Sequence, residues 1–161
     1  MARISALGLD IGRRRVGIAG CDGTGLIATG LDTLYRHRHS FGEDVAFLRA
    51  IAQARQVDTL VVGLPYSMNG ELGHQAHHTQ KYAERLAQAL DLPLIYVDER
   101  LSSVQAEELL RAEGAPLSEN KGLIDRKAAA IILQRWLDAQ RAERNRASQQ
   151  APIQDSAQAP L

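Results

Sequence analysis

Three acidic residues occupy positions where a carboxylate is costly unless a cation balances it. Asp10 interrupts an apolar run near the N-terminus, Glu99 follows a second apolar segment, and Asp125 opens a third. An ionised carboxylate beside a hydrophobic core must be paired or bound to a metal. If the three converge, they form a pocket for hard divalent cations such as Mg²⁺ or Mn²⁺, which prefer oxygen ligands. The sequence therefore predicts that Asp10, Glu99 and Asp125 are both the catalytic residues and the metal ligands.

The chemistry expected of such a site is cleavage of a phosphodiester. Two divalent cations held about 4 Å apart by shared carboxylates can activate a water and stabilise the leaving oxygen. Each acid also has a simpler explanation: Asp10 suits a turn before glycine, Glu99 a solvated strand end, and Asp125 a helix N-cap. The combination favours catalysis. The sequence leaves open whether Asp98 or Glu71 joins the three.

Basic side chains accompany each of the three acids along the chain. Arginines follow Asp10 and Glu99, and basic residues flank Asp125. Each could belong to a solvated turn or helix end, but together they would position phosphates around an acidic centre. The expected nucleic-acid-binding residues are Arg13, Arg15, Arg100, Lys121, Arg126 and Lys127. The Arg-His-Arg-His segment at residues 36–39 is a further basic patch.

Two other groups of residues support weaker hypotheses. His74, His77 and His78 have the helical spacing of a metal site, but no cysteine lies nearby to complete a zinc set. A polar helix start explains them better. The loop at residues 63–70 lacks the Gly-Lys-Ser/Thr ending of a Walker loop. Its glycines would permit close approach of a phosphate or of a neighbouring strand.

The composition predicts one soluble domain in a reducing compartment. The chain has 161 residues, of which 45% are hydrophobic, and 19 basic residues balance 19 acidic ones. A net charge of zero argues against positive potential over the whole surface, but it allows local basic patches. Cys21, the only cysteine, cannot form a disulfide within the chain. The N-terminus shows no signal peptide, and no apolar run could span a bilayer, so we expect a cytoplasmic protein with no membrane contact.

The hydrophobic patterns predict an α/β fold with a five-stranded mixed sheet and helices on both faces. Strands are expected at about residues 4–11, 16–21, 27–34, 59–62 and 94–97, and helices at about 43–56, 75–90, 102–114 and 121–140. The first strands suit an antiparallel meander, whereas the later alternation of strands and helices requires right-handed crossovers and parallel strands. Residues 1–140 form the expected domain, and residues 141–161 an expected disordered tail.

The last expected helix decides whether Asp125 can join the site. Because this helix should start near Lys121, Asp125 lies within it and shares a face with Ala128 and Ala129, three and four residues further on. Small alanines allow a close approach to the sheet. The Asp125 carboxylate should therefore point at the sheet, which a helix cap would not require.

The chain carries four motifs in sequence: Gly8-Leu9-Asp10-Ile11-Gly12 with Arg15-Val16-Gly17, Val62-Gly63-Leu64-Pro65 with Asn69-Gly70, Val97-Asp98-Glu99-Arg100-Leu101-Ser102, and residues 121–129. Together and in this order, they resemble the motifs of the YqgF (RuvX) family, whose members are described as Holliday junction resolvases and as pre-16S rRNA nucleases. The resemblance implies a ribonuclease H-like fold and a divalent cation, with the family's acidic positions falling on Asp10, Glu99 and Asp125. It also implies trimming of the 5′ end of the 16S rRNA precursor in the bacterial cytoplasm.

Three alternative functions follow from the same residues. A DNA junction resolvase would need a homodimer to cut two strands, so the chain is expected to be a monomer or a homodimer. A non-catalytic RNA-binding module would bind RNA without cleaving it. An ATPase of the actin and sugar-kinase type opens with a similar motif at residues 9–12, but it needs two lobes, and this chain has length for one. The expected partner is a nucleic acid, either precursor rRNA or a DNA junction.

Overall fold

A five-stranded mixed sheet forms the centre of the molecule. The computed structural model describes residues 3–38, 40–65, 73–99, 102–114 and 121–150. The strands are β1 (Ala6–Ile11), β2 (Arg15–Cys21), β3 (Ala28–Tyr35), β4 (Thr59–Leu64) and β5 (Leu94–Asp98). They lie in the order β3-β2-β1-β4-β5, with β1, β2 and β3 antiparallel and with β4 and β5 parallel to β1. This arrangement confirms the expected mixed sheet.

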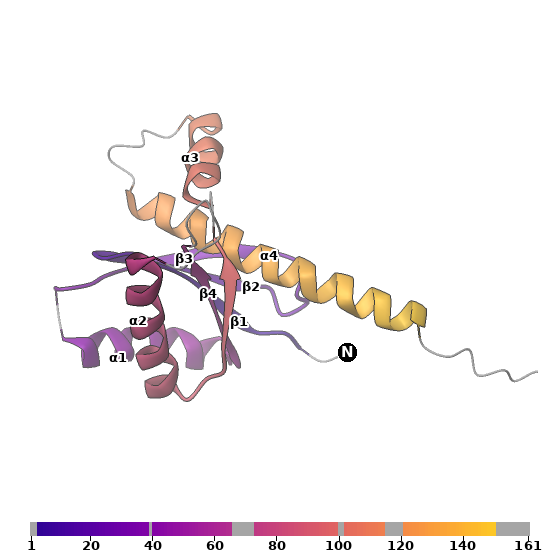
Figure 1. Cartoon of the computed structure of the whole chain (residues 1–161), viewed down its shortest axis with the longest axis horizontal. Helices are drawn as coiled ribbons and strands as arrows, with labels where there is room; N and C mark the ends of the chain where they lie inside the picture. The colour runs from indigo at the N-terminus through magenta and orange to yellow at the C-terminus, as the bar shows by residue number, and fades with distance from the viewer. Residues whose placement is uncertain (1–2, 39, 66–72, 100–101, 115–120, 151–161) are drawn as a thin grey trace, which may run out of the picture.

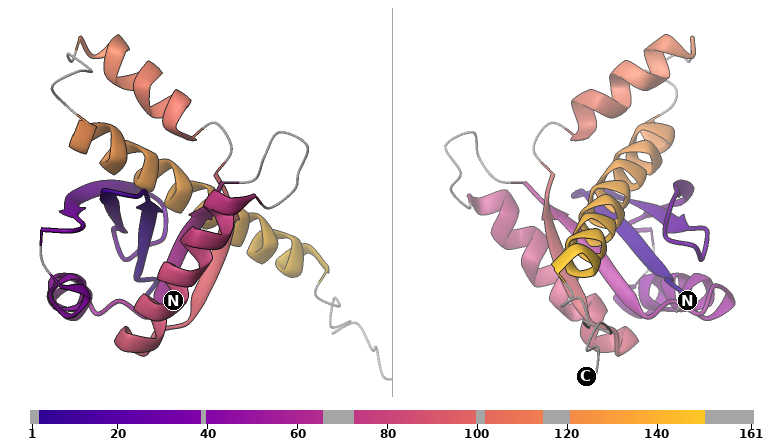
Figure 2. Two further views of the ribbon diagram at one scale, coloured as in Figure 1. Left: turned by 60° about the vertical axis from the view of Figure 1, so that its left-hand side comes forward. Right: turned by 90° about the vertical axis from the view of Figure 1, so that its right-hand side faces the viewer.

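Helices cover both faces of this sheet (Figure 1). They are α1 (Phe41–Ala54), α2 (His74–Leu90), α3 (Ser102–Ala112) and α4 (Lys121–Gln150). Figure 2 shows α4 on the opposite side of the strands from α1 and α2, and α3 packs against α4. Within the described ranges, no helix combines the length and the apolar character that a membrane span requires.

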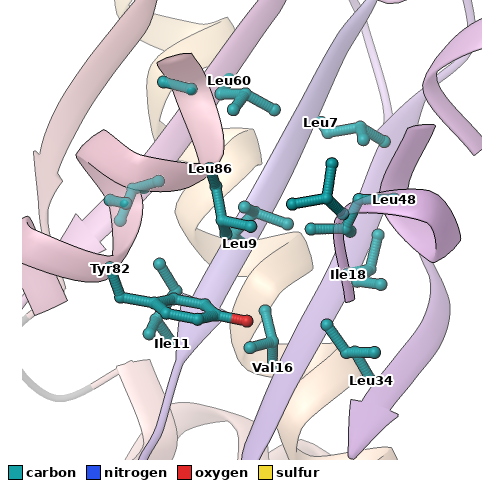
Figure 3. Close-up of a cluster of buried hydrophobic side chains, with 14 of the residues drawn as sticks. Leu7, Leu9, Ile11, Val16, Ile18, Leu34, Leu48, Leu60, Tyr82 and Leu86 are labelled. Atoms are coloured by element: carbon teal, nitrogen blue, oxygen red, sulfur yellow. The ribbon is translucent and has the colours of Figure 1, made fainter. Parts of the chain in front are cut away.

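Strand β1 divides its side chains between two cores. Successive residues of a strand point to opposite faces of the sheet. Leu7, Leu9 and Ile11 are buried against α1 and α2 (Figure 3), whereas Ala6 packs with the residues of α4. The alternation places Asp10 on the α4 side, as a polar residue in a row that is otherwise buried.

The start of α1 and the end of α4 differ from their expected positions. Helix α1 begins at Phe41, earlier than expected, because the Ser40 hydroxyl accepts a hydrogen bond from the Glu43 backbone N–H at 3.2 Å. Helix α4 runs to Gln150, so the expectation of a disordered tail is wrong for residues 141–150. That segment consists mainly of Arg, Ala, Glu and Gln, which favour helix even without a packed face. Residues 151–161 lie outside the described part of the chain.

Glycines in the sheet allow α4 to lie directly on the strands. A methyl group on Gly8 of β1 would come within 2.6 Å of the Leu133 Cβ atom. A methyl group on Gly17 of β2 would lie 3.0 Å from the Asp125 Cβ atom and closer still to the Asp125 backbone. Any larger residue at these positions would push α4 away, and Asp125 with it.

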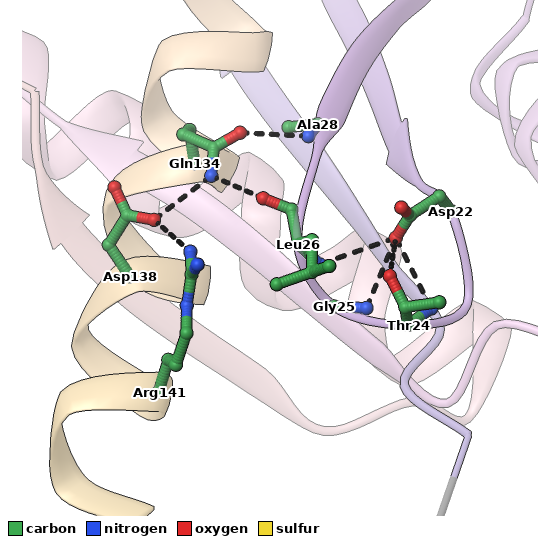
Figure 4. Close-up of polar contacts among 8 residues, drawn as sticks. All are labelled: Asp22, Thr24, Gly25, Leu26, Ala28, Gln134, Asp138 and Arg141. Atoms are coloured by element: carbon green, nitrogen blue, oxygen red, sulfur yellow. Dashed lines mark hydrogen bonds and ion pairs between the residues drawn. The ribbon is translucent and has the colours of Figure 1, made fainter. Parts of the chain in front are cut away.

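Hydrogen bonds fix the position of α4 along the sheet (Figure 4). Gln134 accepts a hydrogen bond from the Ala28 N–H at 2.9 Å and donates one to the Leu26 carbonyl at 2.8 Å. The turn that carries Leu26 is closed by the Asp22 carboxylate, which accepts backbone N–H groups from the residues that follow it. The middle of α4 is therefore tied to the connection between β2 and β3.

We predict that Gly17→Ala destabilises the protein by about 1–3 kcal/mol, because the added methyl overpacks the contact with Asp125. The matched control is Gly42→Ala in α1, where the nearest atom to an added methyl, the Ser40 Oγ, lies 3.8 Å away. That control should leave the free energy of unfolding unchanged or slightly higher, since alanine favours helix. Urea unfolding measures both, and equal effects of the two substitutions would contradict the close packing.

Candidate active site

Asp10 and Glu99 meet at the carboxyl ends of the parallel strands. Strand β4 lies between β1 and β5, and Gly63 is its residue at this level. A methyl group on Gly63 would lie 2.8 Å from both the Cβ and the Oε2 atoms of Glu99. The absence of a side chain at Gly63 therefore lets Glu99 extend across β4, where its carboxyl group forms a hydrogen bond with that of Asp10. The Glu99 N–H donates to the Leu64 carbonyl at 3.1 Å, which continues the pairing of the two strands.

The environment of this carboxyl pair disfavours two negative charges. Burial, with a contribution from the nearby charge of Asp125, raises the pKa of Asp10 to about 6, although the hydrogen bond with Glu99 and the charge of Arg15 oppose this rise. Burial, the charge of Asp10 and the hydrogen bond with Asp10 together raise the pKa of Glu99 to about 9. The two groups therefore retain a shared proton near neutral pH. Paired carboxylates that must share a proton form a donor set that suits a divalent cation, which can replace the proton.

Asp125 lies beside this pair and is bound to an arginine. Its backbone rests on Gly17, which is the residue of β2 paired with Asp10. The Nε atom of Arg15 donates to the Asp125 Oδ2 at 2.5 Å, and both side chains are partly buried. Across the residues that the structure describes, no three His, Cys, Asp or Glu side chains are grouped as metal ligands. The three predicted acids thus form a hydrogen-bonded pair flanked by an arginine-bound third member.

Arg135 is a part of the site that the sequence analysis missed. Its guanidinium donates to the Asp98 carbonyl at 3.0 Å and to the Gln105 side chain at 2.9 Å, and so joins α4 to the end of β5 and to α3. Its positive charge lowers the pKa of Glu99, opposing the effect of burial. The available signal was its spacing, three residues after the buried Ile132 on the face of α4 that meets the sheet.

Several predicted nucleic-acid-binding residues are engaged within the chain. Arg15 binds Asp125, as described above. The other contacts are those of Arg13 with Gln75 (3.3 Å), Arg126 with Thr33 (3.1 Å) and Lys127 with Glu113 (3.2 Å). Lys121 is exposed at the first position of α4, and Arg100 lies outside the described residues. Their role in binding nucleic acid stays a prediction.

Of the remaining candidates of the sequence analysis, the histidines open a helix, Glu71 lies outside the described residues, and Asp98 lies next to Glu99. Helix α2 begins at His74, so the three histidines occupy its first turns, as a polar helix start requires. Glu71 falls in the range 66–72, which lies outside the described part of the chain. Asp98 is the last residue of β5, and its charge contributes to the raised pKa of Glu99.

Known proteins resemble this chain over nearly its whole described length. A family model described as "RuvX: Holliday junction resolvase" matches residues 4–139. A protein of Acaryochloris marina named "Putative pre-16S rRNA nuclease" is 64% identical over 138 residues, which span 86% of this chain and 94% of that protein. A protein of Synechococcus elongatus with the same name is 57% identical over 150 residues, spanning 93% and 99% of the two chains.

A solved structure supports the predicted fold. The structure of T. thermophilus RuvC in complex with a Holliday junction substrate superposes with a TM-score of 0.54 at 16% identity, covering 86% of this chain and 96% of that one. At this identity the likeness concerns the fold alone. It confirms the expected ribonuclease H-like fold.

We predict that Asp10→Asn stabilises the protein in the presence of a chelator, and that the gain grows with pH. Because the pKa values of Asp10 and Glu99 are raised to about 6 and about 9, the folded protein binds protons that the unfolded chain has released. The wild type therefore loses stability as the pH rises from about 4 to about 9. An amide at position 10 removes part of this loss, on the order of 1–3 kcal/mol at pH 8.

Thermal unfolding in EDTA at pH 5 and pH 8 measures this difference. The exposed Asp58 provides a matched control, since Asp58→Asn should change the melting temperature equally at both pH values. If Asp10→Asn raised the melting temperature equally at the two pH values, ionisation of the carboxyl pair would not destabilise the folded protein, and the prediction would be wrong.

Proposed function

The chain belongs to the RuvX family and is a nuclease, and we propose that it trims the 5′ end of the 16S rRNA precursor with divalent cations held by Asp10, Glu99 and Asp125. The observation that carries this proposal is the contact between the Asp10 and Glu99 carboxyl groups, which come from separate strands and meet over a glycine. The substrate is inferred from the relatives that are named as pre-16S rRNA nucleases.

The residues at the site suit Mg²⁺ or Mn²⁺. All three acids offer hard oxygen ligands, and no sulfur or imidazole ligand is required. Asp10 and Glu99 would hold the cation in place of their shared proton, and Asp125 would complete the set on leaving Arg15. When bound, divalent cations supply an activated water and balance the charge that develops on the phosphodiester in the transition state.

Two arginines at the site have separate proposed roles. Arg15 is held against Asp125, so its guanidinium would be free to meet the phosphate next to the acids if Asp125 bound a cation instead. Arg135 is directed at the end of β5, where its charge favours the ionised form of Glu99 that a cation requires. Arg15 would therefore orient the substrate, and Arg135 would position the ligand.

We predict that Asp10→Asn and Glu99→Gln each lower cleavage of a labelled 16S rRNA precursor by at least about 100-fold in Mg²⁺, because a neutral amide cannot replace a charged ligand. Gel analysis of the labelled 5′ leader gives the rate. Asp58→Asn, purified by the same procedure, should cleave at the wild-type rate. Cleavage at equal rates by Asp10→Asn and wild type, in preparations shown to be free of contaminating nuclease, would refute the proposed site.

A DNA junction resolvase is the second candidate, and the description of the matching family model favours it. Side-by-side assays with one preparation discriminate the two substrates. We predict cleavage of the 16S rRNA precursor at its 5′ leader and no cleavage of a four-way DNA junction at the same enzyme concentration. Symmetric cutting of the junction by a sedimenting dimer would favour the resolvase. Tight RNA binding with no cation-dependent cleavage would favour a non-catalytic assembly module.

A further inference from the structure

A basic groove opens beside the acidic residues, at the end of the sheet where β2 begins and β3 ends. The groove has a volume of about 400 Å³ and is lined by Arg14, Arg15, Tyr35, Arg36, His37 and Arg38. None of these six side chains is acidic. Because the chain as a whole has a net charge of zero, this concentration of arginines is a local feature of the surface.

The arginines of the groove differ in what they contact. Arg36 forms part of the wall: it donates to the Gly12 carbonyl at 2.6 Å, and its guanidinium lies 3.9 Å from the centre of the Tyr82 ring. The side chains of Arg14 and Arg38 are exposed, and neither forms a hydrogen bond or ion pair with a side chain or backbone group in the described ranges. In the described part of the chain, these two cations therefore have no anionic partner that would compete with a ligand.

An exposed aromatic ring lies among these cations. The Tyr35 side chain is 37% exposed, and the Arg38 guanidinium lies 4.5 Å from the centre of its ring. Aromatic rings and guanidinium planes are the surfaces on which proteins stack unpaired bases, and arginines beside them bind the phosphates. In duplex DNA the phosphates are accessible, but the bases are stacked inside the helix and cannot stack on a protein side chain. The exposed Tyr35 ring therefore favours binding of a single strand over a duplex.

The groove is continuous with the proposed active site through one residue. Arg15 lines the groove, and its Nε donates to Asp125 at 2.5 Å. A strand whose scissile phosphate lies at the acids would therefore place a neighbouring nucleotide at Tyr35 and Arg38.

We infer that this groove binds a single-stranded RNA segment next to the scissile phosphate, with a base stacked on Tyr35 and Arg38 and a phosphate on Arg14. The position of the segment relative to the cut rests on the proposed function, whereas binding itself does not. The groove would thus select unpaired substrate at the cleavage site.

Fluorescence anisotropy with a labelled single-stranded RNA in EDTA tests binding without cleavage. The double variant Arg14→Ala with Arg38→Ala should weaken binding by about 10-fold or more, and it should reduce the slope of log K against log salt by about 0.7 for each phosphate that the variant no longer neutralises. The charge-matched control removes Arg144 and Arg146, which are exposed near the end of α4. If both double variants weakened RNA binding equally, the inferred groove would be refuted, because the affinity for RNA would then depend on the net charge of the protein alone.

A second comparison tests stacking. Tyr35→Leu should weaken binding of the RNA by roughly 5- to 100-fold, while an abasic strand of the same length should bind the variant and the wild type equally. Tyr35→Phe keeps the ring and should bind as the wild type does. Equal weakening for the RNA and the abasic strand would overturn the stacking role, as would duplex DNA binding more tightly than the single strand.

The outcomes separate this inference from the proposed function. Asp10→Asn should lose cleavage and keep binding, whereas the groove variants should lose binding when cleavage is prevented. Suppose that neither the wild type nor any variant cleaves precursor rRNA, but the groove variants bind RNA more weakly than the wild type. The proposed catalysis is then refuted, whereas the inference that the groove binds RNA still holds. Melting temperatures of all variants within a few degrees of the wild type confirm that binding is compared between folded proteins.

Discussion

The direct packing of α4 on the sheet is the constraint on which the site depends. Side chains normally separate a helix from a sheet, but here the glycines of β1 and β2 let the backbones approach. Asp125 rests on Gly17, and Gly17 pairs with Asp10, so one close contact brings the helical acid beside the strand acid. The hydrogen bonds of Gln134, at the opposite end of the strands, fix the position of the helix along the sheet. The position of the third acid is therefore a consequence of backbone packing.

The carboxyl pair shows the cost that such a site imposes on the fold. Asp10 and Glu99 are held in contact where burial and mutual repulsion oppose ionisation, and a chain selected for stability alone would have placed apolar residues there. Gly63 removes the side chain that would keep the two apart. Arg135 offsets part of the repulsion from the side of Glu99. The two repelling carboxyl groups, and the glycine and arginine that make their contact possible, therefore lie close together in space at the carboxyl ends of the parallel strands.

The charged residues of this protein are unevenly distributed, although their charges sum to zero. Acidic and basic residues balance over the chain, yet arginines gather where β2 begins and β3 ends, next to the acids. Arg15 belongs to both regions, since it lines the basic groove and binds Asp125. In a protein with no net charge, a polyanion is attracted by local fields of this kind and not by the overall charge. The arrangement suits an enzyme that must place one phosphodiester at its carboxylates.

The sequence by itself determined the order of strands and helices, the two faces of the sheet, and the location of Asp125 inside a helix, because hydrophobic periodicity records which face of an element is buried. It also singled out the three acids as candidates, since charge beside apolar runs is a local pattern. Only the tertiary structure decided which groups meet. Arg15, expected to bind nucleic acid, pairs with an acid 110 residues away, and Glu99 reaches Asp10 because Gly63 lies between them. Periodicity specifies a face but not the partner across it, and partners so far apart in the chain are fixed by packing alone.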